Sequence, residues 1–170
     1  NDFIFLPQIV ELFVKGDKRI GKEHQCTCVL AQSEPYFLKS AFRDINTKIL
    51  TPVLNFYEGW DKCEKEFIEI GNELGKSKIE SAEAYKKAVL VFEKSNSLKK
   101  ELGDKVLSEL EKDSAKIGIV LFGRSYNAFA KEANIGIPQK FASRGIYIIP
   151  FDCLRYDDEP SVDNMNWATG

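Results

Sequence analysis

Short apolar runs lie near the two ends of the chain. Residues 3–6, 117–122 and 146–150 are almost continuously apolar. Runs of this length without polar alternation are typical of strands buried on both faces of a parallel sheet. Residues 137–143, opened by Pro138, indicate a helix between the last two runs. The order strand, helix, strand predicts a right-handed βαβ unit.

The middle of the chain has helical periodicity instead. Over residues 52–74 the apolar positions recur at steps of three and four, which predicts one amphipathic helix. Ser77 and Glu80 have the spacing of a capping box, so a second helical stretch is expected to begin there and to extend to about residue 112.

The segment before residue 50 is harder to divide. Residues 16–22 are polar and bounded by glycine, which indicates a loop, and residues 25–30 suit a short strand or a turn. Ser33, followed by Glu34 and Pro35, has the features of a helix N-cap and first turn. A helix is therefore expected to begin at Ser33.

These elements together predict an α/β fold. We expect a Rossmann-like parallel sheet in a single domain over residues 1–170, with a helical insertion over residues 52–113. Lysine and glutamate alternate on the outer positions of the insertion, which indicates a solvated face or a docking surface.

Composition narrows the functional classes. The 170 residues are 44% hydrophobic and carry a net charge of -2, so neither a nucleic acid nor a membrane is an expected partner. No apolar run approaches the roughly 20 residues that cross a bilayer, and the N-terminus lacks a basic signal region, so we expect a cytoplasmic protein. Both ends look cut, which predicts a segment of a larger protein.

Four cysteines are the main candidates for chemistry. Cys26 and Cys28 lie before an expected helix N-terminus, where the helix dipole favours a thiolate and hence a metal or cluster ligand. Buried free thiols are the alternative. Cys63 falls on an apolar stripe and is expected in the core, and Cys153 is expected to be a packed thiol. His24, the only histidine, is either a solvated side chain or a ligand beside the cysteine pair.

Two charged residues follow predicted strands. Arg124 comes after the run at residues 117–122 and Asp152 after the last strand, at the edge where ligands of open α/β sheets bind. Arg124 suits a phosphate or carboxylate ligand there, with a structural role as the alternative. The strands are not followed by a phosphate loop or a dinucleotide-binding glycine pattern, so nucleotide binding within this chain is not expected.

Five short motifs resemble a known family. They are DFIFLP at residues 2–7, CTCVLAQSEP at 26–35, GRSYN at 123–127, NIGIP at 134–138 and MNWATG at 165–170. In this order they resemble the large CoA-substrate-specific enzyme activases, relatives of the 2-hydroxyglutaryl-CoA dehydratase activator. Within those proteins, the chain is similar to the domain that resembles the cluster-bearing dehydratase component.

The resemblance implies a role in ATP-driven electron transfer to an acyl-CoA dehydratase-type enzyme. It implies that Cys28 is a ligand of an iron-sulfur cluster of the 4Fe-4S kind, with Cys26 as a second candidate, and that ATP binds to other domains of the parent protein. The chain alone is then not expected to be a catalyst. We further expect Cys28, Arg124 and Asp152 to meet at a common rim of the sheet.

Two other functional classes remain open. One is a non-catalytic interaction or scaffold domain that docks through its helices. The other is a small-molecule binding module in which Arg124 and Asp152 line a pocket at the carboxyl edge of the strands.

Overall fold

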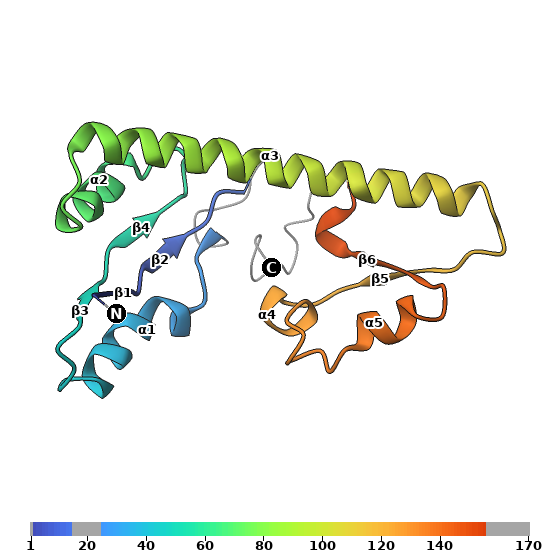
Figure 1. Cartoon of the computed structure of the whole chain (residues 1–170), viewed down its shortest axis with the longest axis horizontal. Coiled ribbons are helices and arrows are strands. Elements are labelled where there is room, and N and C mark those ends of the chain that lie inside the picture. Colours follow the sequence, from blue (N-terminus) through green and yellow to red (C-terminus); the bar gives the residue numbers. More distant parts are fainter. Residues whose placement is uncertain (1, 15–24, 156–170) are drawn as a thin grey trace. The chain divides into compact units, whose positions relative to one another are not determined.

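The computed structural model describes residues 2–14 and 25–155. Among these residues the chain divides into two compact units, one within residues 2–90 and one over residues 91–155 (Figure 1). The expected loop at residues 16–22 and His24 lie outside the described residues.

Four short strands of unit 1 form two parallel pairs: β1 (Phe3–Phe5) with β3 (Lys48–Leu50), and β2 (Gln8–Glu11) with β4 (Val53–Asn55). The pairs follow one another, because Leu6 N donates to Leu50 O and Gln8 N donates to Pro52 O, each at 2.8 Å. Residues 3–11 therefore run beside residues 48–55 along their whole length. Pro7 and Pro52 interrupt the ladder of hydrogen bonds between the strands, because a proline nitrogen has no hydrogen to donate.

Three helices follow or join these strands: α1 (Val29–Ala41), α2 (Glu64–Glu73) and α3 (Lys78–Glu111). α1 lies beside β2, and α2 forms a hairpin with the first turns of α3 (Figure 1). The core of unit 1 is formed by Leu54, Phe56, Cys63 and Tyr85. The Tyr85 hydroxyl accepts a hydrogen bond from Cys63 N and donates one to the Trp60 carbonyl.

Unit 2 contains the predicted βαβ arrangement. It consists of the second part of α3, β5 (Gly118–Leu121), α4 (Ser125–Ala128), α5 (Ile137–Ala142), β6 (Tyr147–Pro150) and the 3-10 turn η2 (Phe151–Cys153). β5 and β6 are parallel, with Leu121 opposite Pro150 (Figure 1). The expected strands at residues 117–122 and 146–150 and the helix between them are confirmed.

Polar contacts join the segment after β6 to α3. Lys99 Nζ lies 3.0 Å from Asp152 Oδ2, and Arg155 Nε lies 2.7 Å from Asp104 Oδ2. Gly103 allows the close approach, since a Cβ atom there would lie 2.0 Å from the Cys153 carbonyl oxygen. This close contact therefore requires glycine at position 103.

The α/β class and the parallel pairing of strands are confirmed, while the predicted single Rossmann-like sheet is not observed. In the described residues the strands form three separate two-stranded sheets. The outer strand β1 is also not buried on both faces as expected, because Phe3 and Phe5 are 39% and 47% exposed. None of the described helices is long and apolar enough to cross a membrane.

The predicted helix over residues 52–74 is wrong in its first half. Val53 to Asn55 form β4, and the helix α2 begins only at Glu64. The helical part of the insertion expected at residues 52–113 therefore begins only at Glu64, after β4 and a turn. Leu54 and Phe56 are buried while Val53 and Asn55 are exposed, which is the period of two that marks a strand.

The predicted starts of the other helices had opposite outcomes. The expected N-cap at Ser33 is wrong, because α1 begins at Val29 and contains Pro35 in its interior. The capping box is confirmed: Ser77 N donates to Glu80 Oε2 at 2.9 Å, and Glu80 N donates to Ser77 Oγ at 3.2 Å. α3 then continues through Ser95 and Ser97 without interruption.

Replacement of Gly103 by alanine tests the close contact in unit 2. Alanine is normally favoured over glycine in a helix by about 1 kcal/mol. We expect Gly103→Ala instead to destabilise unit 2 by about 1–3 kcal/mol, since the added methyl group displaces the Cys153 backbone. Thermal unfolding followed by circular dichroism measures this, with the exposed Glu101→Ala as control. A midpoint at or above that of the wild type would contradict the contact.

Candidate functional site

Cys28 occupies the position immediately before the first turn of α1. Its φ and ψ angles of -54° and 135° are those of a residue that precedes a helix, and its carbonyl accepts the first helical hydrogen bond, from Gln32 N at 3.0 Å. The thiol makes no capping hydrogen bond and is exposed. The first turn of α1 contains no acidic side chain. The Cys28 sulfur is therefore accessible at the positive end of the helix.

Thr27 fixes this position against the sheet. Thr27 N donates to Val10 O at 2.9 Å, and the Thr27 hydroxyl donates to the Ile9 carbonyl. On the helix side, Gln32 Nε2 donates to Thr27 O at 2.9 Å. One residue thus ties the start of α1 to β2, so the backbone of Cys28 is placed by contacts on both sides.

Cys26 lies on the same short segment but faces a different environment. It forms an antiparallel bridge with Glu11 of β2 and is partly buried. Glu11 is itself only 4% exposed, and its carboxylate accepts a hydrogen bond from the Asn55 side chain. The sequence gives no signal for Glu11 or Thr27, because a single charged or hydroxyl residue beside a strand is common on protein surfaces.

The other two cysteines are suited to packing. Cys63 is 1% exposed and its thiol donates to the Asn55 carbonyl at 3.1 Å, so the expected core position is confirmed. Burial raises the pKa of the Cys63 thiol. Burial, followed by the nearby Asp152 carboxylate, also raises the pKa of the Cys153 thiol. Both thiols are therefore protonated at neutral pH, which disfavours a role as ligand or nucleophile.

Arg124 and Asp152 both follow strands of unit 2. They come after the carboxyl ends of β5 and β6, which are parallel neighbours and so end at one edge. Arg124 is exposed, and its carbonyl accepts hydrogen bonds from Asn127 N and Ala128 N in α4. Asp152 is ion-paired with Lys99 of α3. The Asp152 side chain thus has a specific structural contact within unit 2.

The predicted site residues fall into two groups. Cys26 and Cys28 belong to unit 1, whereas Arg124 and Asp152 belong to unit 2. A common rim for Cys28 and the two charged residues stays a prediction. Within the described ranges, no cluster of three or more histidine, cysteine, aspartate or glutamate side chains is arranged to hold a metal ion.

Comparison with protein families assigns the chain to a class of activating proteins. A model described as a CoA enzyme activase uncharacterised domain (DUF2229) matches residues 1–154. Because the match covers most of the chain, the protein belongs to this CoA enzyme activase family. Comparison with curated proteins and with solved structures finds no match.

The accessibility of the thiols predicts their order of modification. At neutral pH we expect a maleimide reagent to modify Cys28 first, Cys153 more slowly, and Cys63 only when the chain unfolds. Cys28 is exposed, whereas burial restricts access to Cys63 and raises its pKa. Peptide mass spectrometry at timed intervals reports each site, and the unfolded chain, in which the thiols react alike, serves as control. Equal rates for Cys28 and Cys63 in the folded protein would refute the assignment.

Proposed function

We propose that this chain is a non-catalytic segment of an ATP-dependent activator of acyl-CoA dehydratase-type enzymes. In this proposal Cys28, together with Cys26, supplies thiolate ligands to an iron-sulfur cluster, and ATP binds to other domains of the same protein. The observation that carries the proposal is the exposed Cys28 thiol, held at the start of α1 by the Thr27 contacts.

The donor chemistry of this segment fits part of a cluster site. Thiolates are the usual ligands of iron-sulfur clusters, and four of them normally complete the shell. Cys26 and Cys28 are both thiols, and in the described part of the chain they are not joined by a third histidine, cysteine, aspartate or glutamate side chain to form a metal-binding group. The remaining ligands would come from residues outside those described. When bound, the cluster would supply one-electron transfer.

The start of α1 suits an anionic group for a second reason. The first backbone N–H groups of a helix lack partners inside the helix and form the positive end of its dipole. Hydrogen bonds from such groups to cluster sulfur atoms adjust the reduction potential of a cluster. The first residues of α1, Val29 and Leu30, are apolar and 72% and 68% exposed. A protein surface over them would exclude water from the cluster.

The same apolar surface supports a second candidate function, which is protein docking without a cluster. Tyr36 and Phe37 of α1 are 62% and 61% exposed, so four large apolar side chains of one helix face solvent. A docking domain predicts a colourless protein that loses a partner upon Leu30→Glu, while Cys28→Ser leaves the complex intact.

Iron binding in the intact activator tests the primary proposal. After anaerobic reconstitution, we expect Cys28→Ser to lose most of the bound iron and of the cluster EPR signal, because a hydroxyl is a poor substitute for a soft thiolate ligand. Cys26→Ser is expected to cause a smaller loss. Iron analysis and EPR spectroscopy on parallel samples provide the measurement.

Cys153→Ser is the matched control for this experiment, since it removes a thiol whose raised pKa disfavours ligation. It is expected to keep the iron content of the wild type. Unchanged iron and an unchanged spectrum in Cys28→Ser would reject the ligand assignment.

A further inference from the structure

Unit 2 contains a cavity of about 350 Å³ at the carboxyl ends of its two parallel strands. Leu121 and Pro150, the last residues of β5 and β6, form part of its wall. The carboxyl ends of parallel strands are the usual place for ligands in open α/β sheets. The volume is within the roughly 300–1,000 Å³ typical of small-molecule sites. The segment that joins the strands and includes α4 and α5 contributes further lining residues (Figure 1), among them Phe129, Asn134, Pro138, Gln139 and Ala142.

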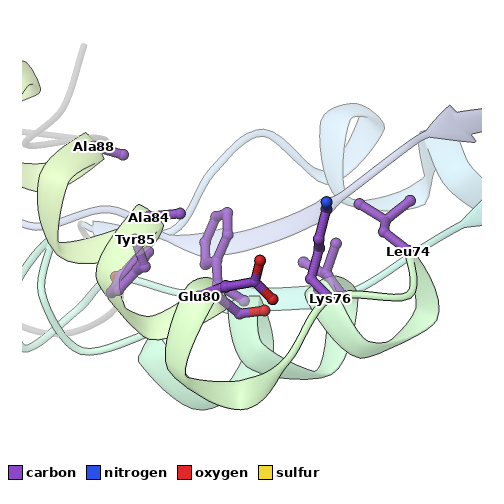
Figure 2. Close-up of a pocket in the computed structure, with 10 residues that line it drawn as sticks. Leu74, Lys76, Glu80, Ala84, Tyr85 and Ala88 are labelled. Atoms are coloured by element: carbon purple, nitrogen blue, oxygen red, sulfur yellow. The ribbon is translucent and has the colours of Figure 1, made fainter.

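The lining of this cavity carries no charge among the described residues. Its side chains there are apolar, apart from the amides of Asn134 and Gln139. A charged ligand group would therefore lose its hydration without gaining an oppositely charged partner. The groove between α2 and α3 in unit 1 differs in this respect, because Lys76 and Glu80 both line it (Figure 2). The lining of the unit 2 cavity favours an uncharged ligand.

An aromatic ring forms one wall of the cavity. The Phe129 ring lines it and stacks on Phe151, with the ring centroids 6.4 Å apart and an angle of 22° between the ring planes. Phe151 in turn stacks on Phe122, at 5.8 Å and 17°. These contacts hold the Phe129 ring in place, so it offers a fixed surface on which an aromatic ligand can pack. Pro138 and Pro150 add rigid apolar surface to the same cavity.

The two amides of the lining differ in their hydrogen bonds. The Asn134 side chain is buried, and its Nδ2 donates to Ala128 O at 3.0 Å while its Oδ1 accepts from Gly136 N at 2.8 Å. Gln139 is exposed, and its side-chain amide takes part in none of the hydrogen bonds found among the described residues. An amide can donate and accept at the same time. Gln139 can therefore form a reciprocal pair of hydrogen bonds with a ligand amide.

We propose that this cavity binds an uncharged aromatic molecule that carries an amide group. The aromatic ring packs against Phe129, Pro138 and Pro150, where it is removed from water. The ligand amide lies beside Gln139, whose side chain donates to the ligand carbonyl and accepts from the ligand N–H. The proposal goes beyond the cluster function, because the described residues that line the cavity all belong to unit 2.

Titration of the intact protein with benzamide, followed by saturation-transfer NMR of the benzamide protons, tests the proposal. Cyclohexanecarboxamide has the same amide without the aromatic ring. It should bind more weakly by about threefold, the effect of losing one aromatic pair. Benzoate has the same ring with a charge. It should bind more weakly by about threefold or more, because no described lining residue offers its carboxylate a cation.

Variants of the lining test the two parts of the site separately. Ala142→Leu extends a branched side chain from α5 into the cavity and should weaken benzamide binding by about tenfold. Ala133→Leu, the same change at an exposed position outside the described lining, is the matched control and should leave the affinity unchanged. Gln139→Met removes the amide and should weaken benzamide binding by about threefold, through the lost hydrogen bonds. Circular dichroism confirms that each variant is folded.

Four results would overturn the proposal. They are the absence of saturable benzamide binding to the intact protein, binding of either comparison compound as tight as that of benzamide, an unchanged affinity in folded Ala142→Leu, and an unchanged affinity in Gln139→Met. The exposed Gln139 position keeps the test decisive if Ala142→Leu does not fold. The iron content of the Cys28→Ser variant is measured separately, so failure here leaves the cluster proposal standing.

Discussion

Parallel pairing between residues 3–11 and residues 48–55 is the constraint on which unit 1 depends. Parallel strands cannot be joined by a tight turn, because the chain must return to the beginning of the sheet. On the way back, residues 25–27 bond to the second edge of β2 in the antiparallel sense, and α1 then completes the crossover. The place where α1 begins, and with it Cys28, is thus a consequence of strand pairing.

Prediction from the sequence succeeded where one signal dominated. β5 and β6 were found because each is a continuous apolar run, and α5 was found because Pro138 marks its first turn. The start of α3 was found because Ser77 and Glu80 make local hydrogen bonds. Prediction failed where the same apolar residues fit both the period of a strand and the period of a helix. Apolar residues from Leu54 to Phe67 fit a helical stripe, yet the first of them belong to a strand and a turn that pack on the same core.

The error at α1 has a different cause. Ser33 and Pro35 resemble a helix start, but tertiary hydrogen bonds from Thr27 to β2 begin the helix earlier. The Ser33 hydroxyl instead donates to the Val29 carbonyl at 2.8 Å inside the helix. For the site, the sequence named Cys28 as a candidate ligand, which stays a prediction, and it placed Cys63 in the core, which is confirmed. The Thr27 contacts could not be foreseen, because they join segments whose pairing has no local signature.

The three sheets have one further physical property in common. Parallel sheets are normally covered on both faces, and two strands alone bury little apolar surface. Here Phe3 and Phe5 of β1, Val53 of β4 and Phe122 beside β5 remain 39%, 47%, 53% and 74% exposed. Unit 1 therefore buries Cys63 and Tyr85 in its core, whereas Cys28 and the apolar first turn of α1 remain exposed. Under the proposed function, a change that preserved the thiol but loosened the Thr27 contacts would impair the site in the same way as loss of the thiol, because an unplaced ligand contributes little to a cluster.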